Sequence, residues 1–85
     1  IVSSPGDNYD FASRCFFPIT GVDEDPVTGS AHTTLSSYWS KKLKKNSMNA
    51  VQLSSRGGEL ECHLANDRVF IGGNAKLFMK GTIYI

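Results

Sequence analysis

The residue types best suited to chemistry lie in one stretch, residues 21–32, which reads GVDEDPVTGSAH. Carboxylates come first, then a proline, and then a turn of small residues that leads into a helical pattern. Pro26 favours an extended conformation at Asp25, and a helix that begins near Ser30 leaves free backbone N–H groups in its first turn. Such groups bind a carboxylate or a phosphate. The stretch therefore predicts an anion-binding turn with the Asp25 carboxyl group at its edge, which is half of an active site.

Two interpretations of this turn stay open. In the functional one, Asp25 binds a substrate's amine or takes part in proton transfer, while the amides of Gly29, Ser30 and Ala31 hold the substrate's carboxylate. Gly29 would let the backbone come close to another group. In the structural one, Asp25 and Ser30 only cap the helix and brace the loop, with Thr28 or Ser30 as the N-cap. The sequence does not decide between the two.

Other kinds of site fit the sequence poorly. Residues 28–32 lack the Gly-x-Ser-x-Gly pattern of a serine hydrolase, and the glycine spacing of a P-loop is missing. The acidic run lacks the alternating ligands of an EF-hand. The side chains that could bind zinc lack the paired spacing of structural zinc sites; they are Cys15, His32, Cys62 and His63. We therefore predict no metal site. Because a lone histidine has no visible partner in the sequence, we expect His32 to be a helix-surface or packing residue.

Hydrophobic periodicity places this turn between a strand and a helix. An apolar stripe of Ala31, Leu35, Trp39 and Leu43 predicts a helix from about residue 30 to residue 44. Period-two alternation predicts strands over residues 9–17, 48–54, 59–64 and 68–71, and one long or two bent strands over residues 75–85. Residues 1–8 are predicted to be a short β-like stub that ends in a turn at 3–8. Turns are also predicted at 56–58, whose arginine could also reach an anion, and at the 66–67 hairpin, and Asn46 is a plausible helix stop. These elements indicate an α+β domain in which one helix packs against a curved, mostly antiparallel sheet.

Composition narrows the range of partners. The chain has 85 residues and a net charge of +1, so charge gives no reason to expect nucleic acid or an anionic membrane as a partner. No apolar run approaches the ~20 residues of a membrane-spanning helix. Two cysteines without close spacing, Cys15 and Cys62, are typical of buried thiols, and we therefore expect a cytoplasmic protein. We expect a single domain over residues 1–85 that is part of something longer.

Several stretches together resemble one protein family. Residues 10–18, DFASRCFFP, and residues 21–32 closely resemble the PhzF-like, or phenazine biosynthesis-like, family, and LSSYW at 35–39 and QLSSRGGEL at 52–60 also match. The resemblance covers nearly the whole chain. It implies a two-domain protein of the diaminopimelate-epimerase fold, in which each half is a barrel-like sheet around a central helix and the active site lies between the halves. Residues 1–85 are then expected to be most of the second half.

The resemblance also implies roles for single residues. Asp25 matches the family's substrate-binding aspartate, and Ser30 with the backbone of Gly29 matches the turn that contacts the substrate's carboxylate and reacting carbon. The family's principal proton shuttle is a glutamate in the other half, beside a Gly-His turn, so Glu24 and His32 are not given these roles. The characterised family reaction is a cofactor-independent isomerisation of a dihydro-hydroxyanthranilate by proton transfer.

These implications give the expected function. We expect a cofactor-independent isomerase of a small, carboxylate-bearing substrate, with Asp25 and Ser30 as catalytic residues and with Asp25, Gly29, Ser30 and Ala31 binding the substrate. The missing N-terminal half of the same protein is the expected partner, and a homodimer is left open. The alternative is a non-catalytic relative that serves as a binding or interaction protein.

Overall fold

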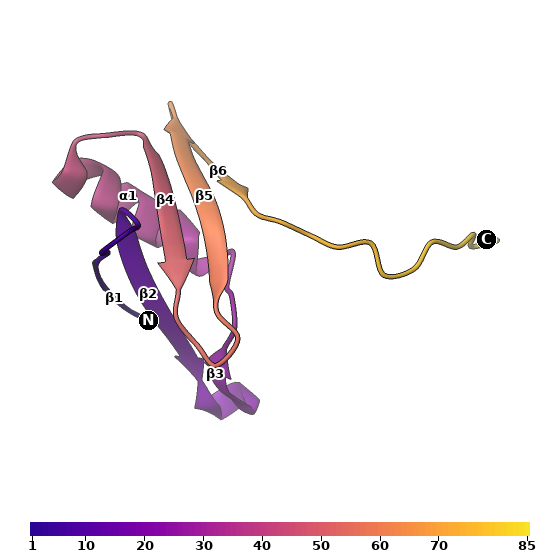
Figure 1. The fold of residues 1–85 in the computed structure, drawn as a ribbon. Helices are drawn as coiled ribbons and strands as arrows, with labels where there is room; N and C mark the ends of the chain where they lie inside the picture. The colour runs from indigo at the N-terminus through magenta and orange to yellow at the C-terminus, as the bar shows by residue number, and fades with distance from the viewer.

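One helix and a curved six-stranded sheet make up the computed structural model, which describes all 85 residues (Figure 1). This confirms the α+β class. The elements follow one another as β1 (Val2–Pro5), β2 (Phe11–Phe17), the 3₁₀ turn η1 (Pro18–Thr20), β3 (Val22–Asp25), α1 (Ala31–Leu43), β4 (Ser47–Gln52), β5 (Gly58–Ala65) and β6 (Arg68–Gly72).

The sheet is mostly antiparallel, as predicted, with one exception at its centre. Its strands are ordered β1-β2-β4-β5-β6, and β3 pairs with the far end of β2. β2 and β4 run parallel, with Phe11 opposite Ala50 and Ser13 opposite Gln52. Parallel neighbours need a long crossover connection, and here that connection contains η1, β3 and α1. The acidic stretch and the helix start therefore lie inside one crossover.

Helix α1 packs across one face of the sheet and closes the core (Figure 1). Ala31, Leu35 and Trp39 are buried as the periodicity predicted, whereas Leu43 is 36% exposed. The rings of Trp39 and Phe11 stack with their centroids 5.8 Å apart, a contact that adds to the apolar area both side chains bury. The core cluster consists of Phe11, Leu35, Trp39, Met48, Ala50, Leu60 and Cys62. With 13 residues, α1 is not long enough to cross a membrane.

The helix ends before its predicted stop. Lys44 adopts a left-handed conformation with φ of 57° and its N–H bonds to the Ser40 carbonyl, which closes the last turn. Asn46 does not end the helix, but its side chain accepts a hydrogen bond from the Ser40 hydroxyl at 3.2 Å. Lys41 and Lys42 lie in the last turn, where positive charge complements the helix dipole.

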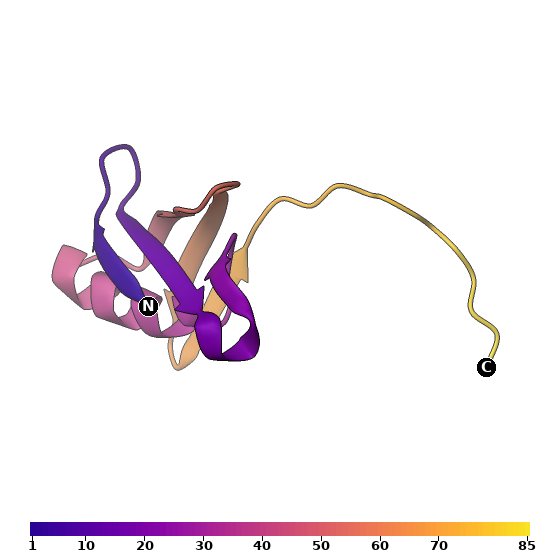
Figure 2. The ribbon, with the colours of Figure 1, turned by 90° about the horizontal axis from the view of Figure 1, so that it is seen from below.

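Two predictions about strands were wrong. The acidic loop contains a strand, β3, which pairs with β2 although acidic residues have poor strand propensity. The Arg14 guanidinium on β2 binds both carboxylate oxygens of Glu24, at 2.7 and 3.1 Å. Residues 75–85 form no strand. They run away from the sheet without a neighbouring strand (Figures 1 and 2), and alternation alone cannot make a strand whose backbone has no partner.

This tail generates a prediction about association. Leu77, Phe78 and Met79 are at least 80% exposed, and β6 is an open sheet edge; both features favour intermolecular pairing. We expect residues 1–85, made alone, to self-associate, and the same chain cut after residue 74 to do so markedly less. Light scattering coupled to gel filtration measures both. Two equally monomeric chains would contradict this expectation.

Candidate active site

Asp25 lies at the end of β3, half-buried, opposite Cys15 of β2. Its carboxylate accepts a hydrogen bond from the Thr28 hydroxyl. Its backbone carbonyl accepts another from the side-chain amide of Gln52, at 2.9 Å. The Asp25 carboxylate is therefore held by the loop itself and is not bonded to the backbone N–H groups of the helix.

The turn at residues 29–31 leaves its backbone donors free. Ser30 occupies the N-cap position, but its φ and ψ of −61° and −35° are already helical and its side chain makes no capping hydrogen bond. The expectation of a side-chain cap by Thr28 or Ser30 is therefore wrong, because the Thr28 hydroxyl bonds to Asp25 and Gln52 instead. The amide N–H groups of Gly29, Ser30 and Ala31 have no acceptor within the chain. They form the electropositive end of a helix; Gly29 and Ser30 are exposed, whereas Ala31 is buried.

Space next to Gly29 is open. No other part of the chain lies within 4 Å of the position that a Cβ at Gly29 would take, so nothing in this chain makes the close approach that the sequence led us to expect there. Gly29 and Val27 line a groove of about 470 Å³ together with the segments 56–60 and 71–74. Arg56 lies in that groove and is exposed. The groove thus brings Gly29 of the helix start together with the Arg56 guanidinium, both of which attract an anion, and with Glu59, whose carboxylate does not.

Behind the turn, His32 is completely buried and faces the core. Its ring nitrogen Nδ1 lies 2.7 Å from the Thr28 carbonyl oxygen, so Nδ1 carries the proton and donates it. Nε2 is then the acceptor for the Ser13 hydroxyl, at 3.4 Å. Burial lowers the pKa of His32, against an opposite effect of the bond to Thr28. His32 is a neutral packing residue with hydrogen-bond partners, which agrees with the packing role expected from the sequence.

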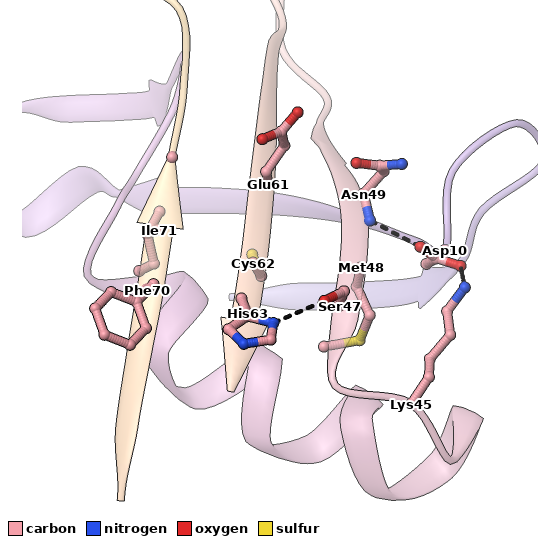
Figure 3. Close-up of a pocket in the computed structure, with 11 residues that line it drawn as sticks. Asp10, Lys45, Ser47, Met48, Asn49, Glu61, Cys62, His63, Phe70 and Ile71 are labelled. Atoms are coloured by element: carbon pink, nitrogen blue, oxygen red, sulfur yellow. Dashed lines mark hydrogen bonds and ion pairs between the residues drawn. The ribbon is translucent and has the colours of Figure 1, made fainter. Parts of the chain in front are cut away.

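A larger hollow, of about 550 Å³, lies elsewhere, over β4, β5 and β6 (Figure 3). There the Ser47 hydroxyl and His63 Nδ1 lie 2.7 Å apart, and the His63 ring packs near Phe70. These side chains are directly opposite one another on neighbouring strands. No carboxylate is bonded to His63, and no helix start lies beside the pair, so the arrangement lacks the orienting group and the oxyanion donors of a serine hydrolase. We interpret it as a cross-strand pair.

The sequence reasoning missed Gln52, which bonds to the segment that carries Asp25. Gln52 falls in the buried row of β4, in phase with Met48 and Ala50. A signal was present, since a polar residue at a core position needs hydrogen-bond partners. The burial pattern indicated that the Gln52 side chain needs hydrogen-bond partners, but it did not indicate that these partners are Asp25 and Thr28.

Comparisons with known proteins agree on one family. A family model described as phenazine biosynthesis-like protein (PhzC-PhzF) matches residues 2–81. An uncharacterized isomerase of Halalkalibacterium halodurans is 51% identical over 82 residues, which are 96% of this chain and 31% of that protein. Phenazine biosynthesis-like domain-containing protein 1 of Mus musculus is 58% identical over 76 residues, which are 88% of this chain and 26% of that protein.

A solved structure gives the same result. The crystal structure of a phenazine biosynthesis protein of the PhzF family from Enterococcus faecalis matches with a TM-score of 0.86 at 51% identity, covering 98% of this chain and 32% of that one. The chain thus spans about a third or less of the length of the curated relatives it matches.

The buried histidine predicts a pH dependence of stability. The native state holds His32 neutral, while the unfolded chain protonates it below its ordinary pKa of 6.5, so the unfolded state binds more protons as the pH falls. We expect the free energy of unfolding of the complete protein to fall more steeply between about pH 7.5 and pH 5.5 than that of its His32→Gln variant. Urea denaturation at several pH values measures the two slopes. Equal slopes would show that burial does not suppress protonation of His32.

Proposed function

This chain belongs to the phenazine biosynthesis-like protein family, and we propose that it supplies one side of the active site of a cofactor-independent isomerase. Its substrate would be a small molecule that carries a carboxylate, and the reaction a proton transfer. Curated relatives are named isomerases. The second side of the site would come from the remaining part of the protein.

The observation that carries this proposal is the open turn at the start of α1. The N–H groups of Gly29, Ser30 and Ala31 have no acceptor in the chain, and open space borders Gly29. A carboxylate that accepts these hydrogen bonds would also benefit from the helix dipole. This supports a role for the turn in holding the substrate's carboxylate.

Asp25 and Ser30 would act on the rest of the substrate. Asp25 would bind an amino group of the substrate or take part in the proton transfer as a carboxylate. The Ser30 hydroxyl is exposed and is not consumed by helix capping, so it is available to contact the substrate near the reacting carbon. Both roles follow the resemblance, residue by residue.

The proton-moving acid–base group would lie outside this chain. Glu24 is engaged by Arg14, whose hydrogen bonds lower the pKa of the Glu24 carboxyl group, and His32 is fully buried behind the turn. Neither group is free to exchange protons with a molecule in the groove. This supports a site completed by a second half of the protein.

The role of Asp25 can be tested in the complete protein. We expect Asp25→Ala to slow the incorporation of solvent deuterium into a dihydro-hydroxyanthranilate by roughly a hundredfold or more, because a positioned carboxylate is lost. Asp23→Ala is the matched control, since Asp23 is an exposed carboxylate on the same strand, and it should react at the unaltered rate. NMR of the recovered substrate measures the incorporation. Unchanged incorporation in Asp25→Ala would remove Asp25 from catalysis.

The same assay separates the proposed enzyme from the non-catalytic alternative. Residues 1–85 alone should give no incorporation, because one side of the site is absent. If the complete protein binds the compound, as measured by calorimetry, and yet gives no incorporation, this substrate is excluded and the binding-protein alternative gains support.

A further inference from the structure

The buried side chain of Gln52 serves a segment distant in sequence. Gln52 is 0% exposed at the end of β4, where an unbonded amide would be costly. Its Oε1 accepts the Thr28 backbone N–H at 2.7 Å, and its Nε2 donates to the Asp25 carbonyl at 2.9 Å and to the Thr28 hydroxyl at 3.0 Å. All its hydrogen bonds thus go to the segment that carries Asp25.

These bonds determine where each proton lies. The backbone partners require Oε1 of Gln52 to be the acceptor and Nε2 the donor. The Thr28 hydroxyl oxygen accepts from Nε2, so its own hydrogen is free to donate to the Asp25 carboxylate. His32 donates to the Thr28 carbonyl at 2.7 Å. The N–H, hydroxyl and carbonyl groups of Thr28 are therefore all engaged, and they fix the residue that connects Asp25 to the open turn.

Packing holds the same segment from the side. A Cβ at Gly58 would lie 2.8 Å from the Val27 Cβ, so only glycine leaves room for this contact without a shift. The Ser54 hydroxyl donates to the Pro26 carbonyl at 3.2 Å. Residues 52–58 thus hold residues 25–28 by hydrogen bonds from Gln52 and Ser54 and by packing of Gly58 against Val27. Since β4 and β5 are part of the core sheet, these contacts tie the loop to that sheet.

We propose that Gln52 and Thr28 are positioning residues that fix the Asp25 carboxylate relative to the Gly29–Ser30 turn. The inference rests on the proposed function, because it concerns how that site is held. Burial alone does not require this arrangement: an apolar side chain at position 52 would continue the Met48–Ala50 row. The Gln52 amide, whose hydrogen bonds all go to the loop, fixes the position of Asp25 more precisely. This matters because reaction rates are sensitive to displacements of a catalytic group by about 1 Å.

Thr28→Val in the complete protein tests this inference. The change keeps the shape of the side chain and removes the hydroxyl. We expect incorporation of solvent deuterium into a dihydro-hydroxyanthranilate to fall on the order of ten- to a hundredfold and Thr28→Ser to restore most of it. Thr34→Val is the control, because Thr34 is exposed on α1 and its side chain makes no hydrogen bond. A fall of less than about twofold in Thr28→Val, well short of the loss that misplacement produces, would overturn the proposal.

A double-mutant cycle distinguishes positioning from general destabilisation. If Thr28 acts through Asp25, then Thr28→Val should cause no further loss in an Asp25→Ala background. Losses that multiply would show that Thr28 acts independently of Asp25, and the proposal would fail. Thr28 is preferred to Gln52 for these variants because replacing a fully buried amide risks unfolding the chain.

A measurement without substrate keeps the two proposals separate. The amide at position 28 is hydrogen-bonded to Gln52, so loosening of the loop will expose it. We expect Thr28→Val to speed hydrogen exchange at that amide by at least about tenfold, with no change in the β4–β5 ladder. An unchanged rate would overturn the positioning role. If wild-type protein shows no turnover but this exchange result holds, the proposed function fails while the Gln52–Thr28 hold on Asp25 stands.

Discussion

The parallel pairing of β2 with β4 is the constraint on which the rest of the structure depends. Parallel neighbours cannot be joined by a tight turn, so the chain must leave the end of β2, cross the sheet and return to the start of β4. The crossover contains Asp25 and the open turn at residues 29–31. Because the helix returns antiparallel to the strands, its N-terminus lies near the carboxyl ends of β2 and β4, where Ser13 and Gln52 are paired. Ligands of α/β units commonly bind at this end of parallel strands.

The core divides along the helix into a part that stabilises and a part that positions. Near the middle of α1, the contacts are mostly apolar, with Trp39 and Leu35 against Phe11 and Met48, beside the small buried hydroxyls of Ser36 and Ser40. Near its start, the buried side chains are polar: Ser13, His32 and Gln52. Each polar group there has a partner, since the structure contains no buried side-chain N or O atom without a hydrogen bond. Polar networks of this kind specify one arrangement more sharply than apolar packing does, which suits the end of the helix that adjoins the open turn.

The sequence predicted elements whose signals are local. The helix, the buried thiols and the hairpin turn at residues 66–67 follow from periodicity and turn chemistry, and Asn66 indeed has a positive φ of 57°. Features that depend on distant partners were not predictable in the same way. β3 pairs with β2, where Arg14 also binds Glu24, and the parallel register of β2 and β4 joins segments far apart in the chain. Residues 75–85 do show period-two alternation, but they form no strand, because no neighbouring strand of this chain pairs with them.

Hydrogen-bond satisfaction bears on both interpretations of the acidic turn. A loop that only braced a helix would use its groups internally, and residues 25–28 do so toward the core through Gln52 and His32. One residue further on, the pattern reverses: the amides of residues 29–31 have no acceptor, and the Ser30 side chain caps nothing. The loop is therefore bonded on the core side and open on the groove side. Bracing explains the first half of this asymmetry. The second half is common to helix starts, whose first N–H groups have no partner within the helix, and it is also what a turn that binds an anion requires.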